Sequence, residues 1–199
     1  MLNPNFVFLG VFIQMMGALS YLKDTIRGKI QPNKVSQLLW GVAPLIAFSA
    51  EISQGVRIQA LTTFIVGFIP LSIFIASFTN KKAYWKIERL DLICGMFSLL
   101  GIILWIVTRL GDIAILFAIF ADGLATVPTM VKSYYHPESE NDALYWTGVI
   151  NAIIGLLVIQ TWNFAHVAFP TYLIVSNLVM TLLIRFKIGE KRIKLGTRN

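Results

Sequence analysis

The charged residues of this chain are gathered in short clusters, and long uncharged stretches separate the clusters. Residues 1–22, 58–80, 92–108 and 143–184 contain no Lys, Arg, Asp or Glu. A soluble domain spreads about 25% charged residues over its surface, whereas 14% of this chain is charged. Hydrocarbon admits long uncharged segments that satisfy their own backbone hydrogen bonds as helices. The sequence therefore predicts an all-α integral membrane protein.

Seven segments have the composition expected of membrane spans. The run 143–184 is too long for one span, which takes about 20 residues. The polar stretch from Gln160 to His166 divides it into two. The second segment is the shortest, and we retain it with Trp40 near the interface. The predicted spans are 5–22, 35–50, 58–78, 92–108, 113–131, 143–160 and 167–184.

Basic residues follow the odd-numbered spans. The linkers after spans one, three and five and the C-terminal tail hold 15 of the 17 Lys and Arg residues, and only Arg57 and Arg109 lie on the other side. Cytoplasmic loops carry this excess of positive charge. We therefore expect an outside N-terminus, a cytoplasmic C-terminus and a multi-pass protein of the cell (inner) membrane. The same distribution accounts for the net charge of +7, because basic residues beside a membrane contact its lipids. We therefore expect the lipid bilayer as a partner and no nucleic acid.

Two landmarks recur at one spacing, which indicates an internal repeat. Gly17 precedes Gly123 by 106 residues, and Trp40 precedes Trp146 by 106. Chance matches in an apolar chain are the alternative. A repeat predicts two parallel three-helix units joined by a linker helix (3+1+3), as in transporters with a substrate site between their halves. The expected divisions are 1–80 for the first repeat, 81–110 for the linker helix, 111–186 for the second repeat and 187–199 for a basic cytoplasmic tail.

Two short segments resemble one family of membrane proteins. The stretch 21–36 (YLKDTIRGKIQPNKVS), followed by Leu38-Leu39-Trp40, resembles the region between helices one and two in the PQ-loop and SWEET (MtN3/saliva-like) superfamily. The segment 128–134 (PTMVKSY) resembles the same region of the second half. The resemblance implies the 3+1+3 fold and an outside N-terminus.

The chain departs from that family at informative positions. Tyr21-Leu22 and Pro128-Thr129 stand where the family usually has Pro-Gln. Thr63 and Thr171 stand where its sugar carriers typically have Asn. Other branches move amino acids or act as sorting receptors, so the resemblance implies a fold and leaves the solute open.

Asp122 is the most informative single residue, because it lies inside the fifth predicted span. An ionised acid at the centre of a membrane helix costs at least about 2.5–3.5 kcal/mol on insertion scales. We hypothesise that Asp122 faces a central cavity and binds substrate or a proton. A structural alternative is a hydrogen bond between helices made by a neutral carboxylic acid.

Other polar residues of the spans are candidates for lining the same cavity. Asn151 shares a helix face with Gly148 and Gly155, and helix packing is the alternative role for it and for Asn177. Trp40 and Trp146 suit either stacking on substrate or anchoring at the interface. Pro44 and Pro128 remove helix hydrogen bonds, so we expect either hinges or shaped packing there. The predicted substrate-binding residues are Asp122, Asn151, Thr63, Thr171, Asn177, Trp40 and Trp146.

The pattern favours a transporter over an enzyme. Only one acid lies within a span, and the sequence has no clustered Cys/His set, phosphate loop or nucleophile elbow, so we expect no catalytic residue, cofactor or metal. The acidic run of Glu138, Glu140 and Asp142 reads as a solvated cytoplasmic loop. We expect a facilitator or proton-linked carrier of a small polar solute, with sugar as one candidate, working by alternating access. The alternative is a non-transporting receptor, sorting or scaffold protein. A homo-oligomer is one of the oligomeric states left open.

Overall fold

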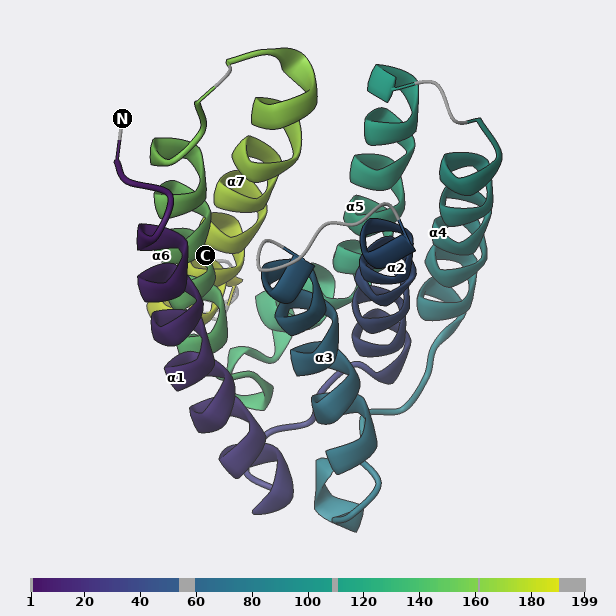
Figure 1. Cartoon of the computed structure of the whole chain (residues 1–199). Helices are drawn as coiled ribbons and strands as arrows, with labels where there is room; N and C mark the ends of the chain where they lie inside the picture. The colour runs from purple at the N-terminus through teal and green to yellow at the C-terminus, as the bar shows by residue number, and fades with distance from the viewer. Residues whose placement is uncertain (1, 54–59, 109–110, 161, 190–199) are drawn as a thin grey trace, which may run out of the picture.

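A computed structural model describes residues 2–53, 60–108, 111–160 and 162–189, and every regular element within these ranges is a helix (Figure 1). The all-helical prediction is confirmed for this part of the chain. Two short 3-10 turns, η1 (Lys81–Ala83) and η2 (Pro137–Ser139), lie in polar linkers. The α-helices are α1 (Phe6–Ile26), α2 (Lys34–Ser53), α3 (Ala60–Ala76), α4 (Arg89–Thr108), α5 (Gly111–Tyr135), α6 (Ala143–Leu157) and α7 (Phe164–Phe186).

Four segments in the described ranges are long and apolar enough to cross a membrane. They are Phe6–Ile26, Arg89–Thr108, Ile115–Tyr135 and His166–Phe186. Two shorter apolar helical segments, Phe64–Ala76 and Ala143–Leu157, accompany them. These helices are what an integral membrane protein requires.

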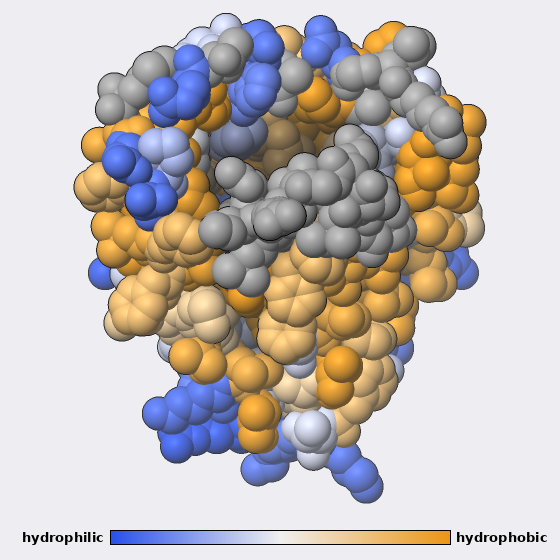
Figure 2. Space-filling view, viewed as in Figure 1, coloured by the Kyte–Doolittle hydropathy of each residue, from blue (hydrophilic) through white to orange (hydrophobic). Residues whose placement is uncertain are grey.

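The outer surface of the bundle is apolar where the helices run side by side. Phe12, Met96 and Val107 are 62%, 66% and 70% exposed. Hydrophobic side chains cover much of the middle of the molecule in Figure 2. Monomeric soluble proteins rarely expose hydrophobic patches of this extent. These side chains are therefore suited to contact with lipid.

Two helices continue beyond the predicted spans into polar sequence. α1 runs to Ile26, past Lys23 and Asp24, and the Thr25 hydroxyl donates to the Tyr21 carbonyl at 3.0 Å within its last turns. α5 passes through Pro128 and ends at Tyr135. A charged residue shows where the chain leaves the apolar layer, but it does not prevent the backbone from continuing as a helix. A predicted span and its helix can therefore end at different residues.

The first three and the last three helices pack in the same order. α1 and α2 both pack against α3, and α5 and α6 both pack against α7. α4 packs chiefly against α5. Between the two groups, α1 lies along α6 and α2 meets α5 (Figure 1). The central space of the bundle is therefore bordered by helices from both groups.

Glycines allow the close approach of α1 to α6. A side chain at Gly17 would overlap the Thr147 hydroxyl and the backbone carbonyl of Ala143, and one at Gly10 would overlap Asn151. Gly123, the sequence counterpart of Gly17, is less tightly packed, since the nearest atom to a Cβ there would be the Tyr172 hydroxyl at 3.6 Å. The repeated glycine is thus a packing requirement at Gly17 only.

We expect Gly17→Ala to lower the free energy of unfolding by about 1–3 kcal/mol, because the added methyl group overpacks a helix contact. Thermal unfolding in detergent measures the loss. Gly155→Ala is the matched control: a Cβ there meets nothing within 4 Å, and alanine favours helix by up to about 1 kcal/mol. A Gly17→Ala protein as stable as the Gly155→Ala protein would contradict the close packing of α1 on α6.

Candidate functional site

A cavity of about 430 Å³ lies between the helices, and each of α1 to α7 contributes to its wall. Binding sites for small molecules commonly measure about 300–1,000 Å³. Val7 comes from the first turn of α1 and Gly155 from the last turn of α6, which places the cavity in the half of the bundle near the N-terminus. The surface is hollowed in the upper part of Figure 2. The lining residues are Val7, Leu39, Trp40, Ala43, Pro44, Val66, Ser98, Ile102, Trp105, Ile115, Ala118, Ala121, Asp122, Ala125, Asn151, Ala152, Gly155, Phe169, Pro170 and Leu173.

Asp122 lines this cavity from the middle of α5. The Tyr172 hydroxyl of α7 donates to its Oδ2 atom at 2.7 Å. An ionised carboxylate has about four acceptor positions on its two oxygens. The Tyr172 hydroxyl therefore holds the side chain and does not use up its capacity to accept hydrogen bonds from the cavity.

Asn151 lines the cavity from α6 and is held by α1. Its Nδ2 atom donates to Oε1 of Gln14. Gly10 leaves room for it, since a Cβ at that glycine would overlap Oδ1 of Asn151. The amide thus combines the two roles that the sequence left open: it bridges two helices and it faces the cavity.

Trp40 and Pro44 also belong to the wall, both from α2. The structure therefore brings four of the predicted residues together: Asp122, Asn151, Trp40 and Pro44.

Other predicted residues lie away from this wall. Asn177 donates from Nδ2 to the Leu173 carbonyl and lies against Gly148 of α6. Thr171 and Trp146 are exposed on α7 and α6, and Pro128 is buried within α5. Thr63 belongs to α3, but its side chain lies outside the described residues.

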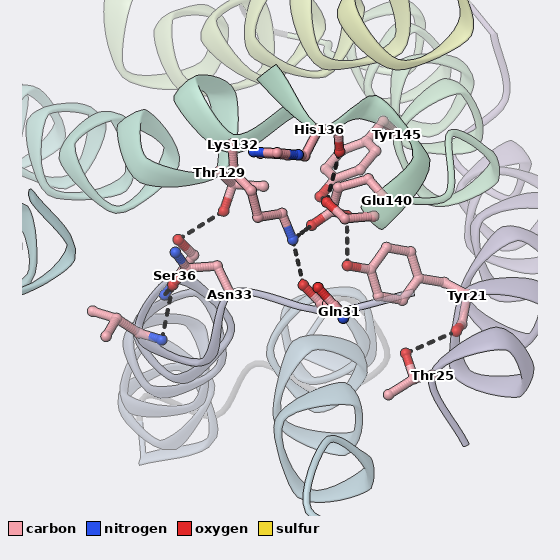
Figure 3. A network of polar contacts seen from close by, with 12 residues as sticks. Tyr21, Thr25, Gln31, Asn33, Ser36, Thr129, Lys132, His136, Glu140 and Tyr145 are labelled. Carbon is pink, nitrogen blue, oxygen red and sulfur yellow. Dashed lines mark hydrogen bonds and ion pairs between the residues drawn. The ribbon is translucent and has the colours of Figure 1, made fainter. Parts of the chain in front are cut away.

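A network of buried polar side chains (Figure 3) lies where α1 and α5 end and α6 begins, near the end of the bundle opposite the cavity. At its centre Lys132 of α5 forms an ion pair with Glu140, and the two side chains are 1% and 0% exposed. Lys132 also donates to the Gln31 carbonyl, and its ammonium lies 5.0 Å from the centre of the Trp85 ring. A buried charge pair requires such additional partners to offset the loss of water.

Two tyrosines complete the surroundings of Glu140. The Tyr21 hydroxyl donates to Oε2 at 2.6 Å, and the Tyr145 hydroxyl donates to the same atom at 3.1 Å. Tyr21 belongs to α1, Tyr145 to α6 and Lys132 to α5. One carboxylate therefore ties the first helix group to the second.

A second branch links α2 to α5. The Thr129 hydroxyl donates to Ser36 Oγ at 2.9 Å, and that hydroxyl donates to the Ala125 carbonyl at 2.6 Å. Nearby, Asn33 Nδ2 donates to Asp91 Oδ1 at 2.7 Å. Ala125 also lines the cavity, so this branch reaches from the cavity wall toward Lys132.

The sequence reading was wrong about Glu140. Glu138 is exposed as expected, whereas Glu140 is 5% exposed and sits inside the network. Lys132, taken as an orientation signal, is 3% exposed. No local sequence pattern distinguishes Glu140 from Glu138, because the burial of Glu140 comes from contacts with Tyr21, Lys132 and Tyr145.

Comparison of the chain with protein-family models, curated proteins and solved structures gave no match. The functional assignment therefore depends on the residues and their geometry.

Proposed function

We propose that this protein is a membrane carrier that moves a small polar solute by alternating access between two helix groups. The observation that carries the proposal is the cavity, which all seven helices line in one half of the bundle and which holds the Asp122 carboxylate in the middle of an apolar helix. The Lys132–Glu140 network closes the other half. A cavity with one closed end is what one state of an alternating-access carrier requires.

Polar side chains of α5 mark a route from the cavity to the closed end. Asp122, Thr126, Thr129 and Ser133 recur every three or four residues, which places them on one helix face. The last three are buried. Within the described residues no hydrogen-bond partner is found for the Ser133 hydroxyl or for the buried Gln37 amide of α2. Unpaired buried polar groups are expensive, and a passing solute or water would satisfy them.

The fold that we propose has seven spans in two parallel three-helix repeats joined by α4. Three observations support it: the shared packing order of the two groups, the alternate placement of basic linkers, and the resemblance to the PQ-loop and SWEET superfamily. The N-terminus would lie outside and the C-terminus in the cytoplasm of the cell membrane. In that orientation the cavity faces outward and the polar network closes the cytoplasmic end.

The opposite state requires the helix groups to separate at the network. Tyr21 would release Glu140 and Lys132 would release the Gln31 carbonyl, because these two contacts cross between the groups. At the same time the two groups would approach each other at the cavity end. Each lost hydrogen bond must find water or a new partner, so the network sets how much of the time the cytoplasmic end is open. Pro128 lies in α5 between Asp122 and Lys132, where a missing backbone hydrogen bond makes bending easier.

Filling the cavity without disturbing the fold tests the proposal. Gly155 lines the cavity and a Cβ there meets nothing within 4 Å, so Gly155→Phe projects a ring into open space. We expect purified protein in vesicles to take up at least one labelled solute from a panel of sugars, amino acids and amines. Uptake should fall at least about tenfold in Gly155→Phe and stay near normal in Gly155→Ala, with both variants melting like the native protein.

The result that would count against a carrier is no flux of any solute together with ligand binding in the same cavity. That outcome would favour the receptor or sorting role. Equal flux in Gly155→Phe and native protein would place the route elsewhere.

A further inference from the structure

The chemistry of the cavity wall narrows the solute class, given the carrier proposed above. Apart from the two tryptophans, only Ser98, Asp122 and Asn151 among the described lining residues have polar side chains. Two of these already donate to protein: Ser98 Oγ to the Ala121 carbonyl and Asn151 Nδ2 to Gln14. The wall is therefore apolar and aromatic, with one acid.

That acid has no basic partner among the described residues of the cavity wall. None of the described lining residues is Lys, Arg or His. The Tyr172 hydroxyl contacts Asp122, but a phenol is a neutral donor. A carboxylate in apolar surroundings needs a cation or must take up a proton. The missing counter-ion points to a positively charged occupant.

The remaining wall suits the body of such a cation. Trp40, Trp105 and Phe169 all line the cavity, and aromatic faces attract cations as well as apolar groups. A sugar fits less well, since its many hydroxyls would find few free partners. A zwitterionic amino acid fits less well too, because its carboxylate would lack a basic partner among the described lining residues.

We propose that the cavity binds organic amines with an apolar or aromatic body, whose ammonium group pairs with Asp122 while the body lies against the aromatic wall. The tyrosine hydroxyl of Tyr172 holds the carboxylate in place. This assignment replaces sugar as the leading solute and rests on the proposed function of the same cavity.

Binding measurements on purified native protein in lipid nanodiscs test the assignment without requiring transport. Phenethylamine, 2-phenylethanol, phenylalanine and glucose form a matched set: amine, neutral isostere, zwitterion and sugar. We expect phenethylamine to bind about 10–100-fold more tightly than 2-phenylethanol, the value of one charge-assisted hydrogen bond. Phenylalanine and glucose should bind more weakly still.

The variant Asp122→Asn should abolish the preference for amine over alcohol, whereas Asp112→Asn should keep it. Asp112 is an exposed acid in the first turn of the same helix and is absent from the described cavity wall. Tighter binding of glucose or phenylalanine, no amine binding, or an unchanged preference in Asp122→Asn would overturn the assignment. Should the variant fail to fold, the four-ligand comparison on native protein decides alone.

The two proposals fail separately. Flux of another solute without amine binding would remove the amine assignment and leave the carrier. Amine binding without flux would remove the carrier function and leave the amine assignment.

Discussion

Glu140→Ala is expected to lower the free energy of unfolding by about 3–5 kcal/mol, the loss found when one partner of a buried ion pair is removed. The Lys132 side chain is 1% exposed and would be left without its carboxylate. The Tyr21 and Tyr145 hydroxyls would lose their shared acceptor as well. Chemical unfolding in detergent, followed by fluorescence, gives the measurement.

A neighbouring acid provides the control. Oε1 of Glu138 lies 3.4 Å from Nδ1 of His136, and these side chains are 63% and 56% exposed. Exposed pairs contribute about 0–1 kcal/mol, so Glu138→Ala should unfold almost like the native protein. Equal losses in Glu138→Ala and Glu140→Ala would mean that the buried network does not hold this end together.

A double substitution separates charge from packing. Replacing a buried pair by apolar residues of similar volume is often neutral or stabilising. Lys132→Met combined with Glu140→Leu should therefore recover most of the stability lost in Glu140→Ala. Absence of recovery would show that the hydrogen bonds from the tyrosines matter more than the uncompensated ammonium.

The helices were predictable because lipid imposes one simple rule. A segment without charge, long enough for the hydrocarbon layer, must form a helix, and the predicted span at 92–108 falls within α4 (Arg89–Thr108). The helix ends were less predictable. α1 continues through Lys23 and Asp24 to Ile26 because helical backbone also suits water.

The cavity was partly predictable for the same reason. Asp122 had to face protein or a cavity, since an acid in lipid is expensive, and it lines the cavity. Thr171 was placed there by resemblance alone, and in the structure it is exposed on α7. Facing directions on a helix depend on which neighbour packs against it, which sequence spacing does not determine.

The polar network was not predictable. Tyr21 and Glu140 are 119 residues apart, yet their side chains are hydrogen-bonded. Each of these residue types is common in exposed linkers. Their burial follows from the way α1, α5 and α6 converge, which no local pattern encodes.

One-sided chemical labelling tests most directly whether the cavity is reached from the N-terminal side of the bundle and closed at the Lys132 end. Cys94, a buried residue, is first replaced by serine, and Gly155→Cys then places a thiol in the cavity wall. Asn5→Cys and Lys81→Cys, at exposed positions near opposite ends, mark the two sides of oriented vesicles. A membrane-impermeant maleimide is added to one side at a time.

We predict that the Gly155→Cys thiol reacts from the side that labels Asn5→Cys, at least about tenfold faster than from the side that labels Lys81→Cys. Adding Glu140→Ala should raise labelling from the Lys81 side, because the closed end is weakened. Fast labelling of Gly155→Cys from the Lys81 side in the otherwise native protein would contradict the account.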